Sequence, residues 1–204
     1  AFAQPDKKIS EEMKAFDKFY QENAKKYGII GSSFAFIHED KLLDHQTYGT
    51  AHIANNYKVD ENTIYHWASI SKTLTAIAIM QLRDRGKLKL DDPITKYVPE
   101  LRQVHNPFGS MDEITIAQIL SHTAGFRGGT FPFGGDKDWH PAEPTKWSQL
   151  AAMLPYTEIL FKPGSKYSYS NPGIVYLGQV IERISGEDFE VYMDKNILKP
   201  LEMY

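Results

Sequence analysis

A serine and a lysine stand three residues apart at the start of an apolar segment, in the stretch WASISKT. Residues 74–82, which follow, are apolar on nearly every side, a pattern typical of a helix buried within a domain. We therefore predict a helix over 69–85. Side chains three residues apart lie on one face of a helix, so Ser69 and Lys72 are expected to be in contact at its N-terminus.

This pair could carry out nucleophilic chemistry. A lysine in the first turn faces the positive end of the helix dipole, which costs about 0.3–1 kcal/mol, so stability alone does not explain Lys72. Its ammonium form is disfavoured there, and the neutral amine could accept the proton of the Ser69 hydroxyl. Backbone N–H groups at the helix start could hold the negative charge of an attacked carbonyl. Alternatively, Ser69 or Ser71 is an N-cap and Lys72 is solvated, because Ser-x-x-Lys alone occurs by chance in many proteins.

A second polar group precedes a later predicted helix, in the segment Tyr169-Ser170-Asn171-Pro172. Locally, Asn171 could simply cap the helix that Pro172 opens, and Tyr169 could fill a gap in the core. Neither local explanation accounts for the order of the two motifs along one chain.

Together these motifs resemble the serine β-lactamase and penicillin-binding superfamily, specifically its branch of class C β-lactamases, DD-peptidases and esterases. That branch carries Ser-x-x-Lys, then Tyr-x-Asn, then a strand with Lys- or His-x-Gly. The sequence LSHTAG at 120–125 resembles the family's Leu-x-His-Thr-Ser-Gly turn, and FKPG at 161–164 resembles its approach to the second motif. The resemblance covers roughly residues 10 to 204.

The resemblance implies a role for each residue. Ser69 is the acylating nucleophile, Lys72 its proton acceptor and Tyr169 a second acid and base. Asn171 is a hydrogen-bond partner for the substrate amide and for Lys72, whereas His122 is structural and bonded to backbone. The implied activity is a serine hydrolase that acts on a β-lactam, a D-alanyl peptide or a small ester or amide.

The third motif is missing, because no Lys-Thr-Gly, His-x-Gly or similar sequence follows Asn171. In the family this motif lies on a strand of the main sheet, and the strands beyond one predicted hairpin are absent here too. A lone hairpin is marginally stable. We therefore expect residues 1–204 to be the N-terminal part of a longer domain, completed by a C-terminal chain or by homodimerisation. The alternative function is a catalytically incomplete fragment, or a non-catalytic protein that binds a ligand or partner.

The expected fold class is α+β, a helical subdomain packed beside an antiparallel sheet whose C-terminal strands are absent. The expected parts are an arm over 1–8, a helix and hairpin over 9–66, and a helical region over 67–204 that carries the motifs. The individual elements are a helix over 10–27, strands over 33–37 and 42–48, and helices over 69–85, 116–120, 174–184 and from about 188, with another after Thr145. Thr115 and Thr145 are predicted N-caps. A long surface loop is predicted over 125–144.

Composition restricts the partners. The 204 residues carry a net charge of −3 with basic and acidic side chains interspersed, so no nucleic acid is expected. No apolar run is long enough to span a membrane. Cysteine is absent and the histidines lack ligand spacing, so we expect no metal and no cofactor, only a small-molecule or peptide substrate. The start Ala1-Phe2-Ala3 fits a signal-peptide cleavage site, which predicts export to the periplasm or outside the cell, although a chance alanine-rich start explains it equally.

Overall fold

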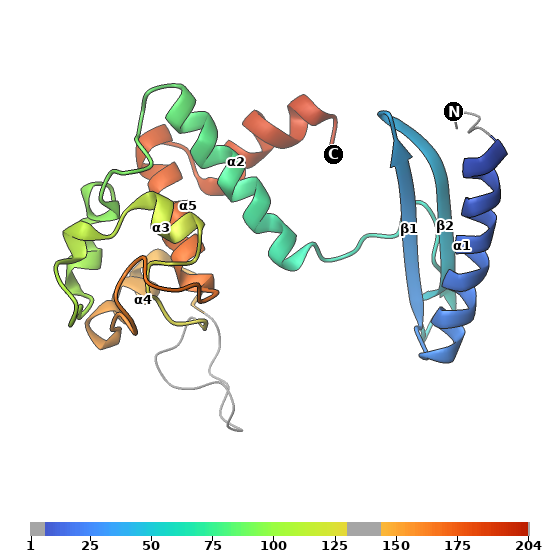
Figure 1. Cartoon of the computed structure of the whole chain (residues 1–204), viewed down its shortest axis with the longest axis horizontal. Coiled ribbons are helices and arrows are strands. Elements are labelled where there is room, and N and C mark those ends of the chain that lie inside the picture. The colour runs from blue at the N-terminus through green and yellow to red at the C-terminus, as the bar shows by residue number, and fades with distance from the viewer. Residues whose placement is uncertain (1–6, 130–143, 204) are drawn as a thin grey trace. The chain divides into compact units, whose positions relative to one another are not determined.

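The computed structural model of the chain describes residues 7–129 and 144–203. The chain divides into two compact units, residues 1–66 and 67–204 (Figure 1). The first contains a helix and an antiparallel sheet, and the second is helical in its described part. The predicted α+β class is confirmed. Most of the predicted loop over 125–144 lies outside the described residues.

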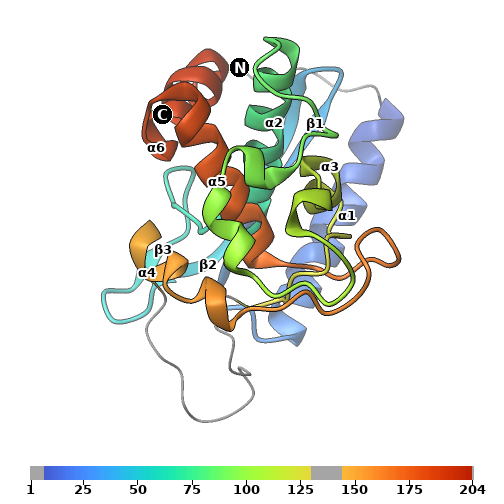
Figure 2. The same cartoon turned by 90° about the vertical axis from the view of Figure 1, so that its left-hand side faces the viewer.

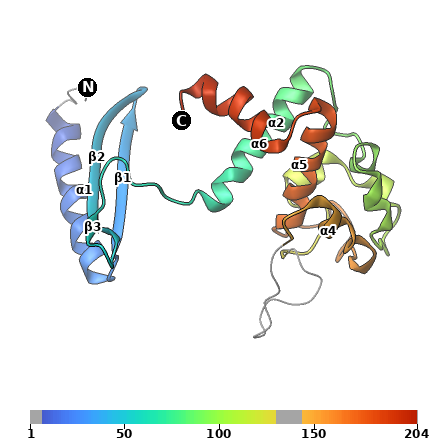
Figure 3. The ribbon, with the colours of Figure 1, turned by 180° about the vertical axis from the view of Figure 1, so that it is seen from behind.

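The unit 1–66 is one helix on a small sheet. Helix α1 (Lys7–Lys26) lies along strands β1 (Gly31–His38) and β2 (Lys41–His52), as Figures 1 and 3 show. The ring centroids of Phe16 on α1 and Phe34 on β1 are 5.0 Å apart in an edge-to-face contact, which joins the two layers. Glu39 and Asp40 both have left-handed backbone conformations, as a two-residue hairpin loop requires.

The sheet has a third strand that the sequence did not indicate. Strand β3 (Tyr57–Lys58) pairs antiparallel with the end of β2, so the strand order is β1-β2-β3. A strand of two residues is too short to show an alternating pattern, which explains why only the hairpin was predicted.

The unit 67–204 contains α2 (Ser71–Asp84), α3 (Ile116–Leu120), α4 (Trp147–Ala151), α5 (Asn171–Ser185) and α6 (Phe189–Met193). Short 3₁₀ helices cover Ala68–Ile70, Ile94–Lys96, Pro99–Gln103, Met111–Glu113, Leu154–Tyr156 and Lys199–Leu201, and a π-helix covers Asp194–Leu198. Figure 2 shows α5 beside α2, and the two helices are in contact.

Side-chain chemistry sets where these helices begin. Thr115 caps α3 in a reciprocal capping box with Gln118, which confirms its predicted role. Ser170 caps α5 by accepting a hydrogen bond from the Gly173 N–H at 3.1 Å. The prediction for Thr145 was wrong, because the N-cap position of α4 falls on Lys146, whose side chain forms no capping hydrogen bond, and Thr145 instead donates its backbone N–H to the Gln149 side chain at 2.9 Å.

The core of this unit holds α2 against α5. Ala78, Ile79 and Leu82 on α2 are buried, as are Leu177 and Ile181 on α5. Burying one such aliphatic side chain contributes about 1.5–3 kcal/mol. Packing of this strength fixes the N-terminal ends of the two helices relative to each other, and both sequence motifs lie at those ends.

Candidate active site

The predicted nucleophile lies in a tight turn ahead of its helix. Ser69 is exposed within the 3₁₀ helix Ala68–Ile70, and α2 begins only at Ser71. The predicted helix over 69–85 is confirmed, with its first turn in the 3₁₀ form. Ala68 has φ 45°, a left-handed conformation that costs a residue with a Cβ roughly 1–2 kcal/mol. Backbone outliers of this kind concentrate at functional sites, where the surrounding structure holds them.

Three of the predicted residues come together at this turn. Lys72 Nζ donates a hydrogen bond to Ser69 Oγ at 3.1 Å. Ser69 Oγ and the Tyr169 hydroxyl are joined by a second hydrogen bond of 2.7 Å. Lys72 Nζ also lies 4.9 Å from the centroid of the Tyr169 ring. The serine hydroxyl is therefore flanked by two groups that can exchange protons, one from each motif.

The surroundings of Tyr169 favour its ionised form. A hydrogen bond from Lys72 lowers the pKa of the Tyr169 phenol most, and the hydrogen bond with Ser69 lowers it further. Burial acts weakly in the opposite direction, because Tyr169 is 38 % exposed.

His122 holds the second motif in place. Its carbonyl oxygen accepts the Ser168 N–H at 2.8 Å, and its Nδ1 accepts the Ser170 N–H at 3.2 Å. Its ring lies 4.7 Å from the Tyr169 ring, measured between centroids. The prediction that His122 is structural and bonded to backbone is confirmed. Burial lowers the pKa of His122, and the positive charge of Lys72 lowers it further.

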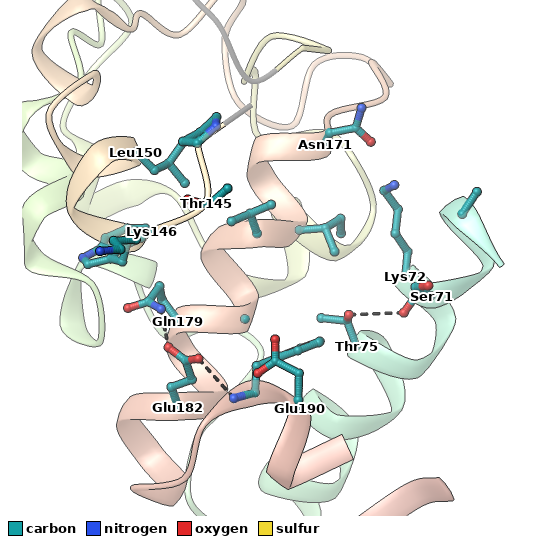
Figure 4. Close-up of a pocket in the computed structure, with 17 residues that line it drawn as sticks. Ser71, Lys72, Thr75, Thr145, Lys146, Leu150, Asn171, Gln179, Glu182 and Glu190 are labelled. Carbon is teal, nitrogen blue, oxygen red and sulfur yellow. Dashed lines mark hydrogen bonds between the residues drawn. The ribbon is translucent and has the colours of Figure 1, made fainter. Parts of the chain in front are cut away.

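Asn171 lies at the first position of α5, and its backbone N–H donates to Gly128 O at 3.0 Å. Figure 4 shows Lys72 extending from α2 toward this end of α5. No hydrogen bond joins the Lys72 and Asn171 side chains, both of which the structure describes. The predicted contact between them is therefore not formed, and the substrate-binding role of Asn171 stays a prediction.

A cavity of about 460 Å³ opens beside Lys72 and Asn171, between α2, α4, α5 and α6. Its apolar wall is formed by Trp147, Leu150, Ile174, Val175 and Phe189. Glu182 and Glu190 line its opposite end (Figure 4), where Glu182 Oε1 accepts the Phe189 N–H at 3.1 Å. Their spacing along the chain does not indicate a shared site, because these residues converge only when four helices pack together.

Other site types find no support in the part of the chain that the structure describes. No group of histidine, aspartate and glutamate side chains there could hold a metal ion. Within residues 7–129 and 144–203, no helix combines the length and apolarity needed to cross a membrane. No strand follows Asn171 in the described residues, so they do not supply the second wall of the cleft that the resemblance implies.

Comparisons with known proteins agree with the motifs. A family model described as Beta-lactamase matches residues 16–204. Protein flp of Staphylococcus aureus (strain N315) is 28% identical over 187 residues, which cover 92% of this chain and 36% of that protein. The chain thus spans about a third of this curated relative.

Solved structures give the same result. A class C beta-lactamase matches with a TM-score of 0.80 at 28% identity, covering 96% of this chain and 50% of that one. The octameric penicillin-binding protein homologue from Pyrococcus abyssi matches with a TM-score of 0.79 at 32% identity, covering 94% of this chain and 43% of that one.

Proposed function

The chain belongs to the beta-lactamase family, and from this membership we propose that it carries the acylating centre of a serine hydrolase, with Ser69 as nucleophile. The resemblance inferred from the motifs is confirmed, and with it the relationship to the serine hydrolases of this family. One observation carries the proposal for this chain. Ser69 Oγ lies 2.7 Å from the Tyr169 hydroxyl and 3.1 Å from Lys72 Nζ.

The two flanking groups share one proton. A neutral amine beside a phenol and an ammonium beside a phenolate differ only in where that proton lies. The hydrogen bond from Lys72 lowers the pKa of the Tyr169 phenol, which makes its phenolate easier to form, and we propose that the reacting form pairs this phenolate with the Lys72 ammonium. In that form Lys72 donates to Ser69 Oγ, which leaves the serine hydrogen free to point at the phenolate. We therefore assign proton abstraction to Tyr169 and electrostatic support to Lys72, which exchanges the roles expected from the sequence.

Acylation then proceeds in two steps. Ser69 Oγ forms a bond to the substrate carbonyl carbon while its proton passes to Tyr169. The bond from that carbon to the leaving nitrogen or oxygen breaks, and Tyr169 returns the proton to the leaving atom. Attack of water on the acyl ester, with Tyr169 again taking and returning one proton, releases the acid and restores Ser69.

The substrate class follows from the family. A β-lactam, a D-alanyl peptide or a small ester or amide presents the carbonyl that this mechanism needs, and Asn171 would bind the amide beside it. We propose that a further polypeptide, either a complementing C-terminal chain or a second copy, supplies the missing wall of the cleft. Export, as the first residues suggest, would place the protein where such substrates occur.

A second candidate function is binding of a ligand or partner without turnover. The described residues provide one side of a cleft, with no strand after Asn171 among them, and one side is enough to hold a ligand. The Ser69, Lys72 and Tyr169 geometry favours acylation.

Intact-mass measurement distinguishes the two candidates. The purified chain is incubated with excess penicillin and, separately, with a fluorophosphonate. A stable added mass is expected in the wild type and in Ser71→Ala, a control that removes the neighbouring exposed hydroxyl, but not in Ser69→Ala. An equal adduct in Ser69→Ala would exclude Ser69 as the nucleophile. If the folded wild-type chain forms no adduct, ligand binding without acylation is the candidate that remains.

A further inference from the structure

We propose that His122 is a positioning residue for Tyr169 and that only its neutral imidazole performs this role. The inference rests on the proposed function, because it concerns the residue assigned there to proton transfer. It goes further by naming a second group whose protonation lowers the activity of the site on the acid side.

His122 holds Tyr169 from both sides along the backbone. The N–H of Ser168 donates to the His122 carbonyl, and the N–H of Ser170 donates to His122 Nδ1. These are the residues immediately before and after Tyr169. The imidazole also lies against the Tyr169 ring, with an interplanar angle of 36°. His122 therefore contacts both backbone neighbours of the proposed base, Ser168 through its carbonyl and Ser170 through its side chain, which also lies against the Tyr169 ring.

The backbone of His122 is adapted to this double contact. Its φ of 56° is left-handed, which is uncommon for residues other than glycine and is tolerated best by asparagine, aspartate and histidine. The residue follows α3, so the contacts tie the Tyr169 segment to that helix. The Ser170 hydroxyl is already used within α5, where it accepts the Gly173 N–H, and it does not replace the contact made by Nδ1.

The hydrogen bond from Ser170 requires that Nδ1 of His122 carries no proton. Nδ1 can accept only while it carries no proton, and a protonated ring would place two N–H donors face to face. It would also add a positive charge near Lys72. The titratable groups that face the imidazole are Lys72, Tyr167 and Tyr169. No carboxylate in the described residues forms an ion pair with His122.

These surroundings keep the imidazole neutral down to acidic pH. Burial and the Lys72 charge hold the pKa of His122 below its ordinary value. A lowered pKa means that the neutral form is favoured in the folded chain. The contribution of His122 is therefore present near neutral pH and is lost as pH falls through its folded pKa.

Two substitutions separate the contacts of His122 from its titration. In His122→Asn, Oδ1 takes the place of Nδ1 as an acceptor, and asparagine tolerates the left-handed backbone but cannot be protonated. In His122→Ala, the acceptor and the ring are both lost. His105→Ala is the matched control, because His105 is exposed and joins its neighbours only through backbone hydrogen bonds.

The first readout is the rate at which a fluorophosphonate phosphonylates Ser69, with loss of fluoride, as a function of pH. Protonation of Tyr169 itself slows every variant, and in the wild type we expect a second acid limb with the midpoint at which the His122 ring titrates by NMR. His122→Asn should keep the neutral rate and lose this acid limb. His122→Ala should lower the maximal rate by about 100-fold, the effect of misplacing a catalytic group by about 1 Å, with little change in the half-saturating concentration.

The second readout does not require acylation. The ring of Tyr169 is followed by NMR across the pH range in each variant. His122→Ala should raise the pKa of the Tyr169 phenol and broaden its ring signals, whereas His122→Asn should not. If the wild type is never acylated but this pattern is seen, the positioning role holds and the proposed function fails. If Tyr169 titrates alike in all variants, or the second acid limb persists in His122→Asn, the positioning role is wrong.

Discussion

The ion pair between Glu100 and Arg183 offers a quantitative test of how α5 is held. Arg183 Nη1 donates to Glu100 Oε2 at 2.8 Å and Arg183 Nη2 donates to Oε1 at 2.6 Å, a two-pronged contact. Arg183 Nη1 also donates to Tyr97 O at 3.0 Å, and the guanidinium lies 5.7 Å from the Trp147 ring centroid. Because α5 carries Asn171 and follows Tyr169, replacing Glu100 tests the anchoring of the second motif.

The magnitude follows from the pKa of Glu100. The hydrogen bonds from Arg183 lower it from its ordinary value of 4.5 to about 2. A change of that size corresponds to at most about 3 kcal/mol of differential interaction. Both side chains are about a third exposed, 32% for Glu100 and 30% for Arg183, so solvent screening reduces the net contribution. We expect Glu100→Gln, which keeps the shape and removes the charge, to destabilise the chain by about 1–2 kcal/mol.

The effect has a defined pH dependence. The folded pKa lies below the unfolded value, so the ion pair stabilises the fold fully above about pH 4.5 and loses its contribution as pH falls toward about 2. Urea unfolding followed by tryptophan fluorescence measures the difference between wild type and Glu100→Gln at each pH. The difference should be largest near neutral pH and should close over that acid range.

Glu158→Gln is the matched control, because Glu158 is exposed and forms no ion pair with the described residues. It should change the free energy of unfolding by less than about 0.5 kcal/mol. A difference for Glu100→Gln that is absent near neutral pH would show that the ion pair does not anchor α5. A difference that stays constant as pH falls would assign the effect to packing, and the electrostatic reasoning would be wrong.

Three further substitutions test other parts of the fold. Thr115→Ala removes the capping box of α3 and should lower the free energy of unfolding by about 1 kcal/mol, measured by urea titration. Burial, and then the hydrogen bond and charge of Asp44, raise the pKa of Asp17, so its stabilising contribution is lost as pH rises. Asp17→Asn should therefore increase hydrogen-exchange protection in α1 near neutral pH, and unchanged protection would contradict this. Gly49→Ala should destabilise the unit 1–66 by more than about 1 kcal/mol, seen as faster exchange in β1, because Gly49 has φ 77° and a Cβ there would lie 2.0 Å from Ile30 O.

The sequence predicted the site well where short-range rules decide the structure. Ser69 and Lys72 are three residues apart, so their contact depends on one turn of backbone. Tyr169 lies just before a capped helix whose serine, proline and terminal glycine all mark its limits. The helix limits of α3 and α5 follow from the same chemistry, since each cap is satisfied within a few residues.

The errors arise where distant packing overrides local preference. Nothing in the local pattern indicates that Ala68 adopts a left-handed conformation or that the first turn before α2 is a 3₁₀ helix. Thr145 has good capping chemistry, yet its backbone N–H donates to Gln149 and the N-cap position falls on Lys146, which forms no side-chain capping hydrogen bond. The cavity beside Lys72 depends on four helices, so its lining could not be derived from spacing in the sequence.

The geometry of Ser69, Lys72 and Tyr169 is necessary for the proposed chemistry, but solvent exposure weakens the electrostatic interactions between them. Ser69 is exposed and Tyr169 is 38 % exposed, so the charge of Lys72 acts on the phenolate partly through water. The same pair of charges interacts several times more strongly once water is excluded. A polypeptide that covers this side would strengthen the ion pair as well as add a wall. Ser69, Lys72 and Tyr169 can therefore be correctly positioned in this chain while acylation of Ser69 is slow. The increase in the acylation rate when a further polypeptide completes the cleft measures the effect of excluding water.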